Sequence, residues 1–163
     1  SEICIRDRYK DGVQQVILNG ENVTSLLRTE ETGKMASKTS KYAAVRTKLV
    51  ALQRGLAKKT DVIMDGRDIG TTVLPDAFAK IYLTASSDAR AKRRYDELKE
   101  KGENCSFDAI KEDIEKRDYE DMHRAISPLK QADDAVLVDT SDMNIEQVVA
   151  ALSKIIDEKK AGR

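Results

Sequence analysis

The sequence predicts an α/β protein with a parallel β-sheet, helices on both faces of that sheet, and a small antiparallel β element at the start. Three short apolar runs, DVIMD (61–65), KIYLT (80–84) and AVLVD (135–139), have the composition of buried strands. Helical stretches at about 86–101 and 106–124 separate the last two runs. Because consecutive parallel strands need long crossover connections, this alternation favours a parallel sheet.

The first part of the chain carries turn and capping signals. Residues 3–18 predict a hairpin in which KDG joins ICIRDRY to VQQVIL, and NGEN at 19–22 predicts a second turn. Thr29 opens a helix with Glu30 and Glu31 in its first turn, where acidic side chains suit the helix dipole.

Two further helices are predicted from apolar residues at helical spacing. Residues 42–57 carry one such stripe, formed by Val45, Leu49, Leu52 and Leu56. The last helix starts at Asn144, with Gln147 three residues later as its capping partner. Its apolar face comprises Ile145, Val148, Leu152 and Ile156.

Composition narrows the function classes. The 163 residues suffice for one ordinary domain, and 36% of them are charged, but Lys+Arg and Asp+Glu number 29 each. This balance gives no general attraction to nucleic acid or to anionic membranes, and the seven aromatic residues form no stacking pattern. No apolar run approaches the ~20 residues of a membrane span, and SEICIRDRYK is too charged for a signal peptide.

The residue types most often found at metal or nucleophilic sites are sparse. Cys4 and Cys105 have no metal-ligand spacing and are expected to be reduced thiols of a cytoplasmic protein. The one histidine, His123, is expected to lie on the surface.

The run DVIMDGRDIG places two carboxylates around a guanidinium directly after an apolar strand. In open parallel sheets, ligands bind beyond the carboxyl ends of the strands, where Asp65, Gly66, Arg67 and Asp68 fall. These residues therefore suggest a phosphate or metal site. The alternative is an ordinary Asp-Gly turn followed by a surface ion pair.

A second signal lies in the helix at 106–124. Phe107, Ile110 and Ile114 mark its buried face, and helical spacing continues that face to Arg117, Asp121 and Arg124. Unpartnered buried charges are costly, so this end either leaves the core for solvent or points into a polar cleft. Two arginines around an acid favour the cleft, because Arg binds phosphate and Asp accepts from sugar hydroxyls.

Two weaker clusters gain meaning only in combination with the others. Arg90, Arg93 and Arg94 share one face of the helix at 86–101, which by itself is typical of a solvated basic surface. Ser37 and Arg46 lie on either side of a helix junction and are unremarkable alone.

The segments DGRDIGTTVLPDAFAKIYLTASSDARAKRR, KRDYEDMHRAISPL and VILNGENVTSLLRTEE together resemble the bacterial cytidylate kinases of the long form. The resemblance runs in order over essentially the whole chain. It implies a P-loop nucleoside monophosphate kinase fold and the transfer of the terminal phosphoryl group of ATP to CMP or dCMP. It also implies three regions: a β insert at 1–28, a helical acceptor-nucleotide region at 29–60, and the C-terminal part of the kinase core at 61–163, with a lid at about 86–104.

The resemblance also implies residue roles. Ser37, Arg46 and Asp68 match the residues that hold cytosine, and Arg67 and Arg117 match contacts to the CMP phosphate. Asp121 and Arg124 match the ribose site, and Arg90, Arg93 and Arg94 fall in the lid over the ATP phosphates. The residues expected at the reacting groups are Asp65, which would position Mg²⁺ through water, Arg93 and Arg117.

One departure from the family is clear. None of the eight glycines opens the GxxxxGK[ST] loop that cradles ATP phosphates, since Gly33-Lys34 is followed by Met35. The resemblance places residue 1 beyond that loop, so we expect these residues to be part of a longer protein and inactive alone. We also expect a divided sheet with exposed apolar edges, because the family's first strand lies between those matching 61–65 and 80–84.

Other functions stay open at this point. One alternative is a related kinase for UMP or AMP, and another is a non-catalytic nucleotide-binding module. The partners expected are ATP, CMP and dCMP, with no nucleic acid and no membrane, for a monomer.

Overall fold

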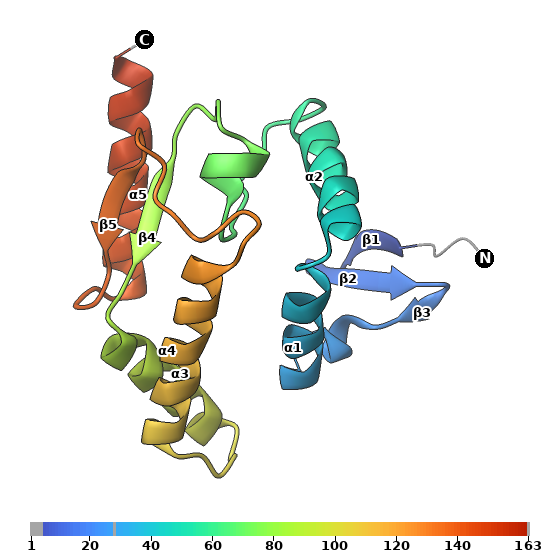
Figure 1. Ribbon diagram of the computed structural model, residues 1–163, viewed down its shortest axis with the longest axis vertical. Coiled ribbons are helices and arrows are strands. Elements are labelled where there is room, and N and C mark those ends of the chain that lie inside the picture. Colours follow the sequence, from blue (N-terminus) through green and yellow to red (C-terminus); the bar gives the residue numbers. More distant parts are fainter. Residues whose placement is uncertain (1–4, 28, 163) are drawn as a thin grey trace. The chain divides into compact units, whose positions relative to one another are not determined.

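A computed structural model of the chain describes residues 5–27 and 29–162 (Figure 1). The chain divides between residues 49 and 50 into two compact units.

The first unit begins with a three-stranded antiparallel sheet in the order β1 (Ile5–Lys10), β2 (Val13–Leu18) and β3 (Glu21–Asn22). Asp11 and Gly12 join β1 to β2 with φ of 53° and 76°, and Asn19 and Gly20 join β2 to β3 with φ of 52° and 93°. Two positive φ angles in a two-residue loop match the right-handed twist of the strands. Both predicted turns are confirmed, and residues 3 and 4 of the predicted hairpin lie outside the described residues.

Helices follow the sheet, as predicted. After a 3₁₀ turn, η1 (Thr24–Leu26), come α1 (Glu30–Thr39) and α2 (Ala43–Ala57). The Thr29 side chain caps α1 by accepting the Thr32 N–H at 3.2 Å. The four apolar residues of the α2 stripe are 39% to 59% exposed, so their spacing predicts the helix correctly without identifying buried residues.

The second unit contains the parallel pair β4 (Ile81–Thr84) and β5 (Val136–Asp139), in register from Ile81 opposite Val136 to Thr84 opposite Asp139. Figure 1 shows both arrows pointing the same way. The crossover between them contains α3 (Ser87–Glu100) and α4 (Phe107–His123), which contact each other. This arrangement confirms the predicted parallel α/β pattern.

The last helix, α5 (Ile145–Ala161), starts with the predicted cap. Asn144 accepts the Gln147 N–H at 2.8 Å, and the Gln147 side chain accepts the Asn144 N–H at 2.9 Å. This reciprocal pair satisfies two of the N–H groups that a helix start leaves without partners. Ile145, expected on the apolar face, is 83% exposed.

The predicted strand at 61–65 is wrong for this structure. These residues pair with no described strand, and Ile63 is 99% exposed. A short apolar run becomes a strand only where a neighbouring strand satisfies its backbone N–H and C=O groups. Among the described residues, the sheet of the second unit contains only β4 and β5. Leu83 in β4 and Leu137 in β5 are each more than half exposed. Both observations agree with the expected divided sheet and its exposed apolar edges.

A small core positions the segment that follows Asp68. Residues Ile69–Val73 form one π-helical turn, η2, and Val73 is only 2% exposed. Arg54, in the last turn of α2, donates to the C=O groups of Val73 (2.9 Å) and Thr72 (2.7 Å). Ala91 and Val138 are the other buried apolar residues in the described part of the chain.

Candidate functional site

The loop of residues 65–68 runs directly into η2, and Asp68 is the residue before that turn. The Asp68 C=O accepts the N–H groups of Thr72 (2.9 Å) and Val73 (3.2 Å), and Asp68 is buried. A Cβ on Gly66 would lie 2.9 Å from Ile69 Cγ1, so a larger residue there would force Ile69 to shift. Local packing therefore fixes the loop that the sequence singled out.

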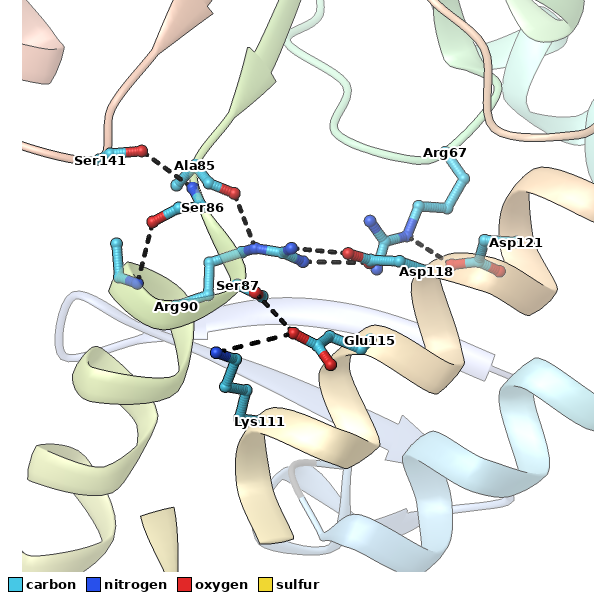
Figure 2. Close-up of polar contacts among 11 residues, drawn as sticks. Arg67, Ala85, Ser86, Ser87, Arg90, Lys111, Glu115, Asp118, Asp121 and Ser141 are labelled. Carbon is cyan, nitrogen blue, oxygen red and sulfur yellow. Dashed lines mark hydrogen bonds and ion pairs between the residues drawn. The ribbon is translucent and has the colours of Figure 1, made fainter. Parts of the chain in front are cut away.

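Four charged side chains from this loop and from the end of α4 form one network. Arg67 Nε lies 3.0 Å from Asp121 Oδ2 (Figure 2). Arg124 lies between two acids, with Nη1 3.7 Å from Asp121 Oδ1 and Nη2 3.9 Å from Asp68 Oδ1. The side chains of Asp68, Asp121 and Arg124 are only 11% to 15% exposed. This burial excludes the alternative in which the end of α4 leaves the core for solvent at Asp121 and Arg124.

Arg124 is held by the turn that ends α4. Its Nε donates to the Ser127 C=O at 2.5 Å, and Ser127 has a φ of 48°. The Leu129 N–H donates to the Asp121 C=O at 2.8 Å, which folds the chain back over the end of the helix. Ser127 was not among the predicted site residues, since its contribution is a backbone carbonyl that any residue type would supply.

The network has unused polar atoms. Asp121 Oδ2 and Arg124 Nη2 are buried and make no hydrogen bond to the described residues. The contact between Arg67 and Asp121 Oδ2 is thus an ion pair without hydrogen-bond alignment. An unsatisfied buried polar atom costs about 1–3 kcal/mol, so a hydrogen bond made to either atom would lower the free energy.

A shallow hollow of about 220 Å³ lies beside the network, at the carboxyl ends of β4 and β5. Its lining includes the three arginines Arg67, Arg90 and Arg93. Arg93 donates to the Thr140 C=O and Oγ1 and to the Met143 C=O, which fixes its guanidinium next to the end of β5. The position agrees with the rule that ligands bind outside the carboxyl ends of parallel strands.

Arg90 is fixed more completely. Its Nη1 and Nη2 donate to the two carboxylate oxygens of Asp118 at 3.0 Å and 2.6 Å, and its Nε donates to the Ala85 C=O at 3.0 Å (Figure 2). Asp118 was not among the predicted residues. A sequence signal existed, because Asp118 precedes Asp121 by three positions on a helix and therefore lies on the same side.

Further polar contacts join α3 to α4. Lys111 forms an ion pair with Asp88 at 2.8 Å, and this hydrogen bond holds the pKa of Lys111 above its usual value. Ser87 donates to Glu115 at 2.9 Å (Figure 2). The region expected to act as a lid is thus tied to α4 near its start.

Three of the remaining predicted residues, all in the second unit, lie outside the network and the hollow. Arg94 pairs with Glu97 at 2.8 Å on the surface of α3, and Asp65 and Arg117 are exposed. Ser37, on α1, and Arg46, on α2, belong to the first unit.

The other sequence expectations concern isolated side chains. His123 is exposed, as predicted, and stacks on Tyr119 with ring centroids 4.0 Å apart. Cys105 is a free thiol, and Cys4 lies outside the described residues. Within residues 5–27 and 29–162, no cluster of three or more His, Cys, Asp or Glu side chains could hold a metal ion. In the same ranges, none of the helices has the length and apolar character needed to cross a membrane.

Comparisons with known proteins identify the family. The family model described as cytidylate kinase matches residues 2–158. Curated relatives named cytidylate kinase include proteins of Lactobacillus johnsonii (51% identity over 153 residues, 94% of this chain and 66% of the relative) and Lactobacillus gasseri (51% over 156 residues, 96% and 68%). A third, from Leuconostoc mesenteroides, is 49% identical over 157 residues, 96% of this chain and 70% of the relative. The chain spans about two thirds of the length of these relatives, and it belongs to the cytidylate kinase family.

Proposed function

We propose that this chain carries the acceptor-nucleotide side of an ATP-dependent kinase that converts CMP or dCMP to CDP or dCDP. The observation that supports this most is the network of Arg67 with the largely buried Asp68, Asp121 and Arg124, in which two polar atoms lack hydrogen bonds. Family membership supports the choice of reaction.

The network suits a nucleoside monophosphate. Asp121 can accept from ribose hydroxyls, and the buried Nη2 of Arg124 can donate to a ribose or phosphate oxygen. Arg67, which is 39% exposed, keeps both of its terminal nitrogens for the acceptor phosphate. Arg117 would approach the same phosphate from the exposed side of α4.

Cytosine would be selected by hydrogen bonding. It presents an amino donor at C4 beside acceptors at N3 and O2. A carboxylate such as Asp68 accepts from the amino group, Arg46 donates to the acceptors, and Ser37 adds a further polar contact. Uracil places a carbonyl against the carboxylate, so buried polar groups would stay unpaired with the wrong base.

Phosphoryl transfer requires alignment and positive charge rather than covalent chemistry by the protein. Arg90, Arg93 and Arg94 would supply charge near the ATP phosphates. Mg²⁺ in such enzymes is held by one or two carboxylates and by substrate phosphates, and the exposed Asp65 carboxylate fits that limited role. When bound, the ion would neutralise charge on the phosphate oxygens.

These 163 residues alone are expected to show no turnover, because they contain no GxxxxGK[ST] segment to hold the ATP phosphates. The assay is ADP formation from ATP and CMP, on protein whose intact mass equals the 18.2 kDa of this sequence. Turnover by that verified protein would contradict the expectation.

The acceptor site is tested by binding. Calorimetric or NMR titration with CMP, dCMP, UMP and AMP should show preference for CMP and dCMP, and Asp68→Asn should reduce the preference for CMP over UMP. The matched control is Asp76→Asn, an exposed acid in the loop that follows η2. Equal binding of CMP and UMP by the unaltered chain would refute the role of Asp68, and preference for AMP would favour a related kinase.

A further inference from the structure

We propose that Asp118 is a positioning residue that orients Arg90 toward the phosphate groups of a bound nucleotide. The inference rests on the proposed function only for the identity of the ligand. The geometry that supports it lies entirely within the second unit.

Asp118 and Ala85 together fix the guanidinium of Arg90. The two terminal nitrogens donate one hydrogen bond each to the carboxylate, and Nε donates to the Ala85 C=O. A guanidinium has five N–H donors in a rigid fork, so three are used and two stay available. The side chains of Arg90 and Asp118 are 32% and 18% exposed, which shields the pair partly from water.

The hollow next to this pair has the charge pattern of a phosphate site. Arg67 reaches it from the loop before η2, and Arg90 and Arg93 reach it from α3. Asp118 is the one carboxylate among its described lining residues. Each arginine has an acceptor that fixes it: Asp121 for Arg67, Asp118 for Arg90, and the Thr140 carbonyl for Arg93. Fixed guanidinium groups that keep free donors can bind phosphate with little loss of conformational entropy.

Figure 2 shows how α4 organises two of the three arginines. Asp118 and Asp121 are one helical turn apart, and they receive Arg90 and Arg67 respectively. A single rigid helix therefore sets the spacing of two phosphate-binding groups.

Positioning and simple charge predict opposite results for Asp118. A carboxylate that lines an anion site repels the anion, so its removal should tighten anion binding if charge alone matters. If the carboxylate instead holds Arg90 in place, its removal should weaken binding although the site becomes more positive.

The experiment is a titration of the purified chain with inorganic pyrophosphate, and separately with CMP, at low ionic strength. We expect Asp118→Asn to weaken pyrophosphate binding about five- to tenfold, the effect of losing one charge-assisted hydrogen bond. The matched control is Asp113→Asn, an exposed acid on the same helix, which should leave binding unchanged or slightly tighter. Unchanged or tighter binding by Asp118→Asn would overturn the proposal.

A second variant tests the proposal even if Asp118→Asn does not fold. Arg90→Lys keeps the charge but loses the two-point pairing, and it should also weaken pyrophosphate binding several-fold. In a protein that already carries Arg90→Lys, Asp118→Asn should weaken pyrophosphate binding little further, since Asp118 acts through Arg90. If the two losses of affinity instead add in full, Asp118 affects binding only by stabilising the fold, and the proposal is overturned. Pyrophosphate binding by Arg90→Lys equal to that of the unaltered chain would overturn the proposal even if Asp118→Asn does not fold.

The two proposals can fail separately. If the unaltered chain binds pyrophosphate with the expected dependence on Asp118 but shows no preference for CMP, the acceptor assignment is wrong and the role of Asp118 stands. If it prefers CMP and Asp118→Asn changes nothing, the proposed function stands and this inference is wrong. Absence of pyrophosphate binding would overturn the inference whatever the result with CMP.

Discussion

Replacement of Arg124 by Met should destabilise the second unit strongly, because Arg124 lies between two buried carboxylates. At an effective dielectric of about 20, unit charges nearly 4 Å apart attract by about 4 kcal/mol, and Arg124 has such a contact with both Asp68 and Asp121. Desolvation of the three groups offsets most of that attraction while the pairs are intact. The variant removes the attraction and leaves the carboxylates buried.

The expected loss in the free energy of unfolding depends on which contacts remain in Arg124→Met. Breaking a buried ion pair costs about 3–5 kcal/mol, and loss of the hydrogen bond to the Ser127 carbonyl acts in the same direction. Arg67 remains 3.0 Å from Asp121 and compensates in part, so we expect a net loss of about 2–3 kcal/mol. Met preserves most of the apolar stem, which limits the effect to the charged end.

The assay is urea unfolding followed by far-UV circular dichroism, with Arg94→Met as the matched control. Arg94 also pairs with an acid, Glu97, but on the exposed surface of α3, so its replacement should cost at most about 1 kcal/mol. Equal effects of the two variants, or a loss below about 0.5 kcal/mol for Arg124→Met, would show that the network is solvated and would refute the burial argument.

Three further predictions concern local features. Hydrogen bonds from Lys101 and Arg94 lower the pKa of Glu97 to about 2. The ionised Glu97 therefore stabilises the folded state above pH 4.5, and this contribution is lost as the pH falls toward 2. An NMR titration of Glu97 should show the low midpoint, and a midpoint near 4.5 would contradict the prediction. Asn144→Ala should cost about 1 kcal/mol in urea unfolding through loss of the α5 cap, whereas the exposed control Asp142→Ala should cost much less. Gly12→Ala should weaken the β1–β2 hairpin by about 1 kcal/mol because φ at this turn is 76°, and faster amide hydrogen exchange in β2 would report it; unchanged exchange would contradict the prediction.

Part of the candidate site could be predicted from one helical face. Spacing on the helix at 106–124 placed Asp121 and Arg124 on the side of the apolar residues, and in the structure their side chains are only 11% and 15% exposed. The same reasoning did not distinguish Arg117 from Asp121 and Arg124. Arg117 is exposed, although it lies on the same predicted face. Helical periodicity shows on which side of the helix a residue lies. It does not show how far along the helix neighbouring segments cover that side, because this depends on the tertiary structure.

The pairing of Arg90 with Asp118 shows a second limit. The two residues are 28 positions apart and lie on different helices, so no local pattern indicates that their side chains meet. The basic face of α3 therefore grouped three arginines without showing which of them line a site. The structure distinguishes Arg90 and Arg93, which line the hollow, from Arg94, which pairs with Glu97 on the surface.

The sequence by itself determined the helices, turns and caps, because these depend on residues within a few positions of one another. Asp11-Gly12, Thr29 and the Asn144–Gln147 pair act through their own backbone geometry and need no distant contact. Family membership is likewise a property of the ordered motifs. Only the tertiary structure decided that residues 61–65 form no strand and that Asp118 holds Arg90, because backbone pairing and ion pairing need partners that the fold brings from far along the chain.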